Sequence, residues 1–462
     1  MARAILPAKF NHGQSCNLSF KFQQESANSV LAFAVAFRRE ECPRHTIHST
    51  SSIKSEGRRL TPEVGISMAS HDNVIAIIFG LIIIWAVLLD AFETVVLPRR
   101  VTRHFKLTAW FYRRTWIPWK KIAASIKTPS WQQNFLGYFG PLSLFMLLAF
   151  WAVGLIFGFA LLQYGFGGHE QLNREPLTFG KIVYHSGETF FTLGYGDIVP
   201  TSPVARLLSV LEAGMGFGFL GTVIGYLPVV YSSFSRREIQ ISMLDSRAGS
   251  PPTATELLVR LAGRSEDPGV DQTVLDEVLR DWERWSAELL ESQISYPVLT
   301  FFRSQHSNQS WLGALTTMLD VTSLVLTGIE GVQPGQAKLT FAMARHAAVD
   351  LAQVVNARYD GQAPERLTDA EFDALRDALA ATGLKLRSTE EGRQKLTRLR
   401  SMYEPYVHST ARNLMIVLPP WRHPAKVRDN WQAGPWDRII QAKGLAVLGQ
   451  HPLQPPVIED HF

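Results

Sequence analysis

A short loop, residues 192–197, holds the side chains and backbone best suited to bind a bare metal cation. It reads Thr-Leu-Gly-Tyr-Gly-Asp. Gly194 and Gly196 tolerate positive φ angles, so the loop can turn successive backbone carbonyls toward one axis. Carbonyls arranged in this way can replace the water shell of a dehydrated cation such as potassium. We expect the ligands to be the Thr192 hydroxyl and the backbone carbonyls of Thr192, Leu193, Gly194 and Tyr195.

Two long apolar segments, 138–166 and 204–231, flank this loop, and each is long enough to cross a membrane. An apolar helix, a re-entrant loop with Thr-x-Gly-Tyr-Gly and a second apolar helix resemble the pore module of potassium channels that carry one pore loop per chain. The resemblance covers a pore domain at residues 138–235 and implies a selectivity filter at residues 192–196, built by four chains in a homotetramer. It also implies that K⁺ is the permeant ion, that no other cofactor is needed and that the protein is not an enzyme.

The residues around the loop extend the resemblance. Residues 179–191 can form a short pore helix, whose carboxyl end would direct partial negative charge toward the ion. Glu188 and Asp197 would share one proton behind the filter and brace it, because two carboxylates so close cannot both stay ionised. A Glu188 that caps or solvates the loop is the alternative. Tyr184 and His185 lie where the family often has aromatic donors to the filter tyrosine, with a hydrogen-bonded structural histidine as the other interpretation.

The second apolar segment is rich in glycine. Gly216 lies where the resemblance places the hinge of the inner helix, and we expect the helix to bend there. Close packing is the alternative, because small residues spaced four apart let membrane helices approach one another. Glu212 lies in the same apolar helix, where a charge is costly, so we expect it to be protonated, paired or facing water.

A third apolar segment predicts a further membrane helix at residues 68–97. The positive-inside rule puts the basic stretch 99–127 in the cytoplasm, because the filter loop carries far fewer Lys and Arg. The N-terminus is then outside the cell membrane and the C-terminal part is cytoplasmic. Asp90 and Glu93 lie at the cytoplasmic end of this helix, where we expect them to pair with the basic stretch.

Residues 98–137 mix aromatic with basic side chains, a composition typical of a segment in the lipid headgroup layer. We expect anionic lipid to be the partner of this interfacial linker. The linker either pulls on the gate, as the slide helix of inward-rectifier channels does, or serves as a passive anchor. The cations expected to contact lipid are Arg113, Arg114, Lys120 and Lys121.

Residues 1–67 are polar, and we expect them to be disordered. A start at Met68 is an alternative, because it would leave only a short tail without Lys or Arg outside the membrane. The net charge of +5 reflects in part the basic stretches next to the membrane, so it does not predict nucleic-acid binding.

Residues 236–462 show helical periodicity interrupted by Pro and Gly turns, which predicts a cytoplasmic helical domain. They contain no glycine-rich nucleotide fingerprint, phosphate loop, nucleophile elbow or zinc signature. Residues 311–326 are apolar enough for a fourth span, but Asp320 and several threonines favour a buried helix in a soluble bundle. The predicted fold class is an all-α membrane protein, with three transmembrane helices, a re-entrant pore helix and filter, and a helical domain, assembled as a tetrameric pore.

The sequence therefore predicts a potassium-selective, prokaryotic-like channel with an extra N-terminal transmembrane helix, gated at the inner helix by a signal that the residues do not identify. A weakly selective cation channel is one alternative, and the intact Tyr195 and Gly196 argue against it. A membrane-anchored signalling or scaffold protein with a non-conducting pore module is the other.

Overall fold

The computed structural model describes residues 71–96, 106–166, 178–262, 269–306, 308–357, 359–361, 364–387 and 390–423. The segment 1–67, which we expected to be disordered, lies outside these residues, as do the basic residues 97–105 and the end of the C-terminal domain after residue 423. The described residues all belong to the unit Ser67–Phe462. The described part is helical and has no strand beyond an isolated bridge between Ile329 and Leu386, which confirms the all-α class.

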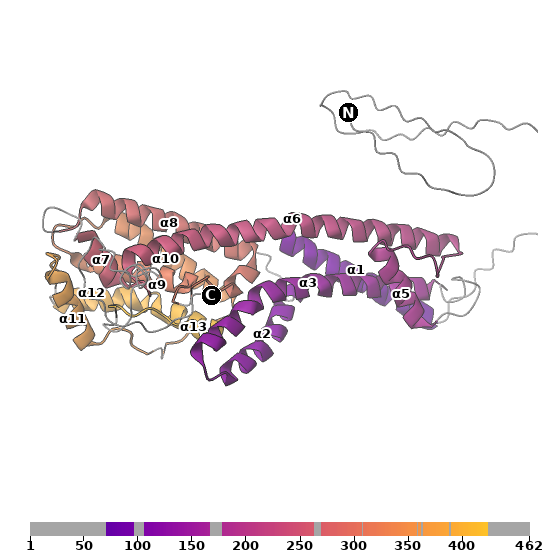
Figure 1. The fold of residues 1–462 in the computed structure, drawn as a ribbon, viewed down its shortest axis with the longest axis horizontal. Coiled ribbons are helices and arrows are strands. Elements are labelled where there is room, and N and C mark those ends of the chain that lie inside the picture. Colours follow the sequence, from indigo (N-terminus) through magenta and orange to yellow (C-terminus); the bar gives the residue numbers. More distant parts are fainter. Residues whose placement is uncertain are drawn as a thin grey trace, which may run out of the picture. The chain divides into compact units, whose positions relative to one another are not determined.

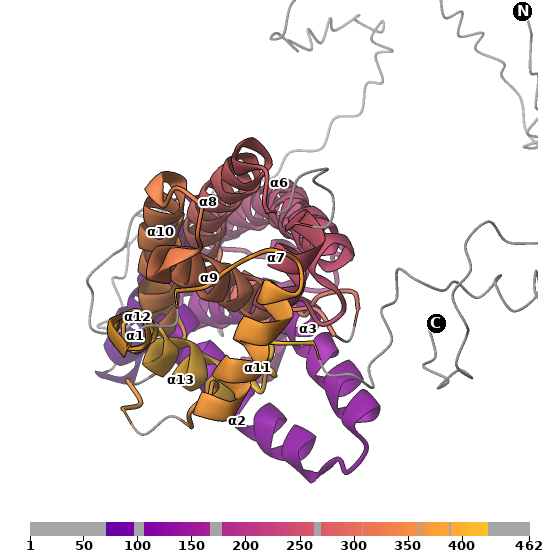
Figure 2. The ribbon, with the colours of Figure 1, turned by 90° about the vertical axis from the view of Figure 1, so that its left-hand side faces the viewer.

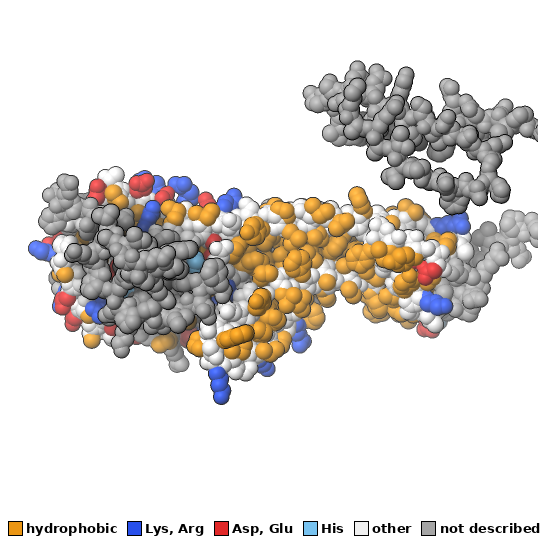
Figure 3. Space-filling model, in the orientation of Figure 1, with side chains coloured by type: hydrophobic (Ala, Val, Ile, Leu, Met, Phe, Trp, Pro, Cys, Tyr) orange, Lys and Arg blue, Asp and Glu red, His pale blue; other side chains and the backbone are white. Residues whose placement is uncertain are grey.

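Three of the helices contain a long apolar stretch of which no more than half is buried inside the protein. They are α1 (His71–Val95), α3 (Pro129–Gly165) and α6 (Pro203–Ala248) (Figure 1). Hydrophobic side chains cover the surface where these helices run, whereas charged side chains gather over the C-terminal helices (Figure 3). An uninterrupted apolar surface of this kind is stable against lipid and unstable in water, so the protein is a membrane protein with several spans.

A short helix, α5 (Phe179–Phe190), packs between α3 and α6 and leads directly into the loop at residues 192–197. Its buried face carries Ile182, Ser186 and Phe190. This is the place and the length expected for the re-entrant pore helix. Because α5 is held on both sides by long helices, its carboxyl end is fixed relative to the loop that follows.

The helices after α6 form what we call the C-terminal bundle: α7 (Ala254–Ala262), α8 (Gln272–Ser295), the short 3₁₀ helix η1 (Pro297–Phe301), α9 (Trp311–Gly328), α10 (Gly335–Val354), α11 (Asp369–Ala380), α12 (Glu390–Ser401) and α13 (Glu404–Leu414). Figure 2 shows α9 surrounded by other helices. Although α9 is long and apolar enough to cross a membrane, 94% of it is buried inside the protein. It is therefore the core of the bundle and has no face left for lipid.

Helix α2 (Leu107–Ser125) differs from a segment that lies wholly in the headgroup layer. Its Tyr112 ring stacks on Phe301 of η1 at 5.5 Å, and Trp116 packs on Phe301 at 5.2 Å and on Phe139 of α3 at 4.8 Å. Aromatic rings that suit a membrane interface suit a protein interface equally well. One face of α2 is thus buried between α3 and the C-terminal bundle.

We call the packing of η1 and Phe302 against α2, α3 and α6 the junction. On its α6 side, the buried guanidinium of Arg237 donates to the carbonyls of Leu299 at 2.8 Å and of Phe302 at 2.9 Å. Because Arg237 also binds the neighbouring Glu238 at 2.9 Å, its charge is paired inside the junction. The junction connects the C-terminal bundle to the helices on both sides of the pore loop.

Candidate functional site

The backbone of the loop that follows α5 alternates between two conformations. Residues Thr192, Gly194 and Gly196 have φ angles of 55°, 67° and 77°, and they alternate with residues of ordinary φ. Alternation of this kind turns successive carbonyls to the same side. Gly194 and Gly196 adopt these angles without strain, whereas Thr192 does so at a cost that its surroundings must offset. The backbone of the predicted ligands is therefore compatible with carbonyl coordination, and the coordination itself stays a prediction.

The pore helix holds the start of this loop through its own last turn. The N–H of Thr192 donates to the carbonyl of Thr189 at 3.1 Å, and the N–H of Leu193 donates to the carbonyl of Glu188 at 2.9 Å. The side chains of Leu193 and Tyr195 are exposed in the single chain. These two side chains point away from a packed core and are free to contact whatever surrounds the loop.

Glu188 reaches from the pore helix to the far end of the loop. Its buried carboxylate accepts the N–H of Gly196 at 3.1 Å, so it connects α5 to the end of the loop. Asp197 accepts the N–H of Ile198 at 3.1 Å, and its carboxylate interacts with the Tyr184 hydroxyl. Glu188 thus contacts the loop and Asp197 contacts the residue that follows it, and the bracing pair with its shared proton stays a prediction.

His185 faces the inner helix in this chain. Its Nε2 lies 3.3 Å from the Ser209 hydroxyl of α6, and the contact that we expect with the tyrosine of the loop stays a prediction. His185 is buried, as expected for a hydrogen-bonded structural histidine.

Gly216 lies where α6 crosses the end of α5. A Cβ atom at this position would come within 1.8 Å of the carbonyl oxygen of Phe190, far closer than any real contact. Close packing therefore accounts for this glycine, and its role as a hinge stays a prediction. Around Gly214, Gly218 and Gly221 a Cβ atom would meet nothing within 4 Å in the described part of the chain.

Two buried acids take part in contacts that the sequence did not indicate. Asp90 of α1 accepts the hydroxyl of Thr108 at 2.6 Å and the indole N–H of Trp151 at 3.0 Å, so it joins the start of α2 to α3. Our expectation that Asp90 pairs with the basic stretch missed this role, and residues 97–105 of that stretch lie outside the described residues. Glu212 of α6 binds Gln163 of α3 and Ser186 of α5 behind the pore helix.

The four cations of the interfacial linker have different surroundings. Arg113, Arg114 and Lys121 are exposed on the outer face of α2, and the Arg114 guanidinium lies 5.9 Å from the Trp110 ring. Lys120 instead donates to the carbonyl of Arg412 in α13 at 2.8 Å. Burial, and then the positive charge of Arg412, lowers the pKa of Lys120. Of these four cations, Arg113, Arg114 and Lys121 are the exposed ones, and their contact with lipid stays a prediction.

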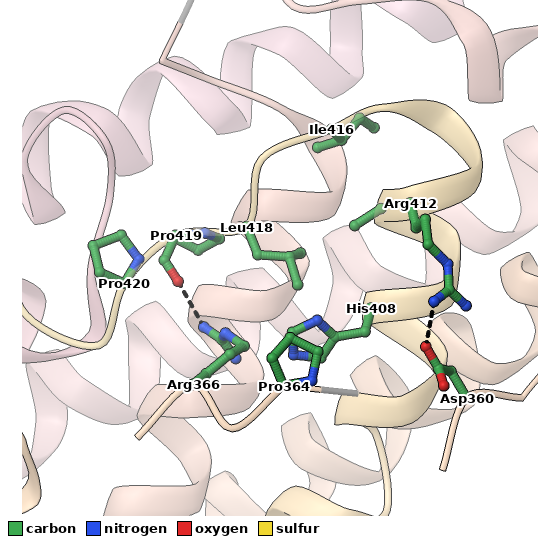
Figure 4. A pocket seen from close by; sticks show the side chains of 10 residues that line it. Asp360, Pro364, Arg366, His408, Arg412, Ile416, Leu418, Pro419 and Pro420 are labelled. Carbon is green, nitrogen blue, oxygen red and sulfur yellow. Dashed lines mark hydrogen bonds and ion pairs between the residues drawn. The ribbon is translucent and has the colours of Figure 1, made fainter. Parts of the chain in front are cut away.

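The C-terminal bundle has a pocket of about 440 Å³ (Figure 4). Arg412 and Asp360 form an ion pair of 2.7 Å at one side of it, and the Arg366 guanidinium donates to the carbonyl of Pro419 at 2.8 Å on the other. Burial, followed by the positive charge of Arg366, lowers the pKa of His408, which lines the pocket between them. The pocket is therefore lined by charges that already have partners in the protein.

Comparison with known proteins adds independent information on the same region. Residues 145–232 match a protein family described as an ion channel, and this stretch holds α5, the loop and the apolar part of α6. A membrane protein of Bacillus subtilis (strain 168), named YdjJ and described as uncharacterized, is 24% identical over 276 residues, which make up 59% of this chain and 75% of that protein. No solved structure matches the chain.

Proposed function

We propose that the protein is a potassium-selective channel that conducts K⁺ passively, and the premise is the match of residues 145–232 to a protein family described as an ion channel. One observation carries the potassium assignment. The loop Thr-Leu-Gly-Tyr-Gly-Asp has positive φ angles at Thr192, Gly194 and Gly196, and Glu188 holds its end. Carbonyl oxygens around one axis can replace the water shell of a dehydrated potassium ion, and alternating positive φ angles suit such an arrangement.

Four chains are proposed to form the pore, because each chain supplies one filter strand and a closed ring of carbonyls needs four. The exposed apolar side chains of α6 support this assembly. A helix that lines a pore buries one apolar face against the next chain, and another of its faces points toward the ion path. The residues concerned are Leu207, Leu211, Phe217, Leu220 and Ile224.

We propose that the first three spans cross the cell membrane with the N-terminus outside and the C-terminal bundle in the cytoplasm. The basic residues before α3 and the few cations near the filter support this orientation. Anionic lipid is the proposed partner of the outer face of α2. The junction then offers a route by which the bundle or the lipid acts on α3 and α6, and so on the gate.

The proposal is tested by potassium flux, with sodium as the comparison, in liposomes that hold the full-length chain. Gly194→Asp introduces a side chain and a charge at a φ of 67°, so it should abolish the flux. Gly335→Asp is the matched control, because Gly335 is exposed and a Cβ atom there meets nothing within 4 Å. Equal sodium and potassium flux would point to a weakly selective pore. Absence of flux from a well-folded wild-type tetramer, with lipid composition varied, would favour the scaffold interpretation.

A further inference from the structure

Glu212 is a carboxyl group completely enclosed where α3, α5 and α6 meet. Its Oε2 accepts the side-chain N–H of Gln163 at 3.2 Å, and its Oε1 is hydrogen-bonded to the hydroxyl of Ser186. Glu212 has no part in the proposed coordination of K⁺ by residues 192–196. It nevertheless touches the pore helix on one side and the outer helix on the other, so its protonation state bears on how the pore helix is held.

The hydrogen bonds of Ser186 indicate the protonation state of Glu212. The Ser186 Oγ lies 2.7 Å from the carbonyl oxygen of Ile156, which can only accept a hydrogen bond. A serine hydroxyl has one hydrogen, and if it is donated to Ile156 it is not available to Glu212. The hydrogen in the bond between Ser186 and Glu212 must then come from Glu212. Glu212 is thus a neutral carboxylic acid that donates to Ser186 and accepts from Gln163.

The surroundings of Glu212 favour the neutral form. On α5, the titratable neighbours His185 and Glu188 bind Ser209 and Gly196, and Lys181 is exposed. On α6, Arg206 donates to the carbonyl of Pro200, and on α3 the ring of Tyr164 packs on Phe179. The Glu212 carboxyl itself is hydrogen-bonded to the neutral side chains of Gln163 and Ser186. An ionised carboxylate enclosed in this way would lack a compensating cation.

We propose that Glu212 is a protonated positioning residue whose hydrogen bond to Ser186 fastens the pore helix to α3 and α6, so that potassium conduction falls when alkaline pH removes the proton. The effect on conduction rests on the proposed function. Loss of the proton would force the Ser186 hydroxyl to turn from Ile156 to the carboxylate and would leave a charge enclosed among three helices. Because α5 leads directly into residues 192–197, any loosening of α5 reaches the filter.

The protonation state is tested without any flux measurement. The infrared difference spectrum between the full-length wild type and Glu212→Gln, both in liposomes, should contain the carbonyl band of a neutral carboxylic acid at neutral pH. Ser186→Ala, made in a chain that keeps Glu212, removes the acceptor of the Glu212 hydrogen. It should therefore shift the carbonyl band of Glu212. A spectrum at neutral pH that contains only carboxylate bands for Glu212 would overturn the assignment, whatever the protein conducts.

Flux tests the second half of the proposal. Glu212→Gln keeps a donor toward Ser186 and an acceptor toward Gln163, so its potassium flux at neutral pH should equal that of the wild type. The wild type should lose flux severalfold at alkaline pH, whereas Glu212→Gln should not. Glu212→Ala, which has neither group, should conduct poorly at every pH. A Glu212→Gln channel that loses flux at alkaline pH as the wild type does would refute the role of this proton. If no variant conducts, the proposed function fails while the infrared result still decides the proton.

Discussion

Gly140 of α3 lies directly against Phe302, so close that a Cβ atom on Gly140 would come within 2.7 Å of a carbon of the Phe302 ring. Phe302 in turn accepts a hydrogen bond from Arg237 through its carbonyl at 2.9 Å. The helix before the pore loop and the helix after it are therefore both held by one residue at the end of η1. Both helices therefore share one contact with the C-terminal bundle.

Gly140→Ala should destabilise the protein by about 1–3 kcal/mol, because the added methyl group must displace the ring and backbone of Phe302. The measurement is the thermal unfolding temperature of the full-length protein in detergent. Gly137→Ala is the matched control in the same helix, because a Cβ atom there meets nothing within 4 Å. If both variants unfold at the same temperature, the contact between Gly140 and Phe302 does not restrain α3.

Gly216→Ala should prevent α6 from packing on α5, because its methyl group would overlap the carbonyl oxygen of Phe190 at 1.8 Å. We expect a lower unfolding temperature and loss of potassium flux, with Gly218→Ala as the control that has open space. A hinge role alone leads to a different result, in which the protein is as stable as the wild type and only its gating changes. The stability measurement thus separates the two interpretations of Gly216.

The residue pattern near the loop was enough to predict the backbone of the loop and the short helix before it. The order of Gly194, Gly196 and the apolar segments on either side is enough to predict positive φ angles and a pore helix, because both depend on residues close in sequence. The apolar run at α9 was likewise correctly assigned to a bundle core, since Asp320 within it needs a buried partner rather than lipid.

Contacts between distant residues could not be predicted in this way. Trp151 binds Asp90 across 61 residues and Ser186 binds Glu212 across 26, and no periodicity in one chain indicates which buried acid meets which donor. The sequence also did not predict which face of α2 contacts the protein and which face is exposed. Aromatic residues near basic ones indicate an interface, but composition does not tell whether Trp116 faces lipid or, as found, Phe301.

Arg366→Met should destabilise the C-terminal bundle by about 3–5 kcal/mol, because it leaves the buried carboxylate of Asp320 without its cation. Arg366 binds Asp320 at 2.7 Å, and the Tyr403 hydroxyl donates to the same carboxylate at 2.6 Å. Arg376→Met is the control: Arg376 pairs with Asp373 and Asp377 in a more exposed position, and surface pairs contribute about 0–1 kcal/mol. Urea unfolding in detergent measures both. Equal losses of stability in the two variants would contradict the prediction.

Replacement of Arg113, Arg114 and Lys121 by Gln should weaken the response of potassium flux to anionic lipid. These cations lie exposed on one face of α2, where a negative membrane surface attracts each by about 1 kcal/mol. The measurement is flux in liposomes with an increasing fraction of anionic lipid. Lys395→Gln, on the exposed side of α12, is the control and should behave as the wild type. A triple variant that responds to anionic lipid as the wild type does would exclude this face as the lipid contact.

His408 should make the C-terminal bundle less stable in acid. Burial and the nearby Arg366 lower its pKa in the folded protein, whereas in the unfolded chain it is near the ordinary value of about 6.5. As the pH falls through about 6.5, the unfolded chain therefore binds a proton that the folded protein does not, so the free energy of unfolding decreases. It decreases until the pH reaches the lowered pKa of the folded state. His408→Gln has no proton to bind in either state. When the pH is lowered from above 6.5 to below the pKa of the folded state, the unfolding temperature of the full-length variant in detergent should therefore fall less than that of the wild type. An unchanged pH dependence in His408→Gln would show that other groups cause the loss in acid.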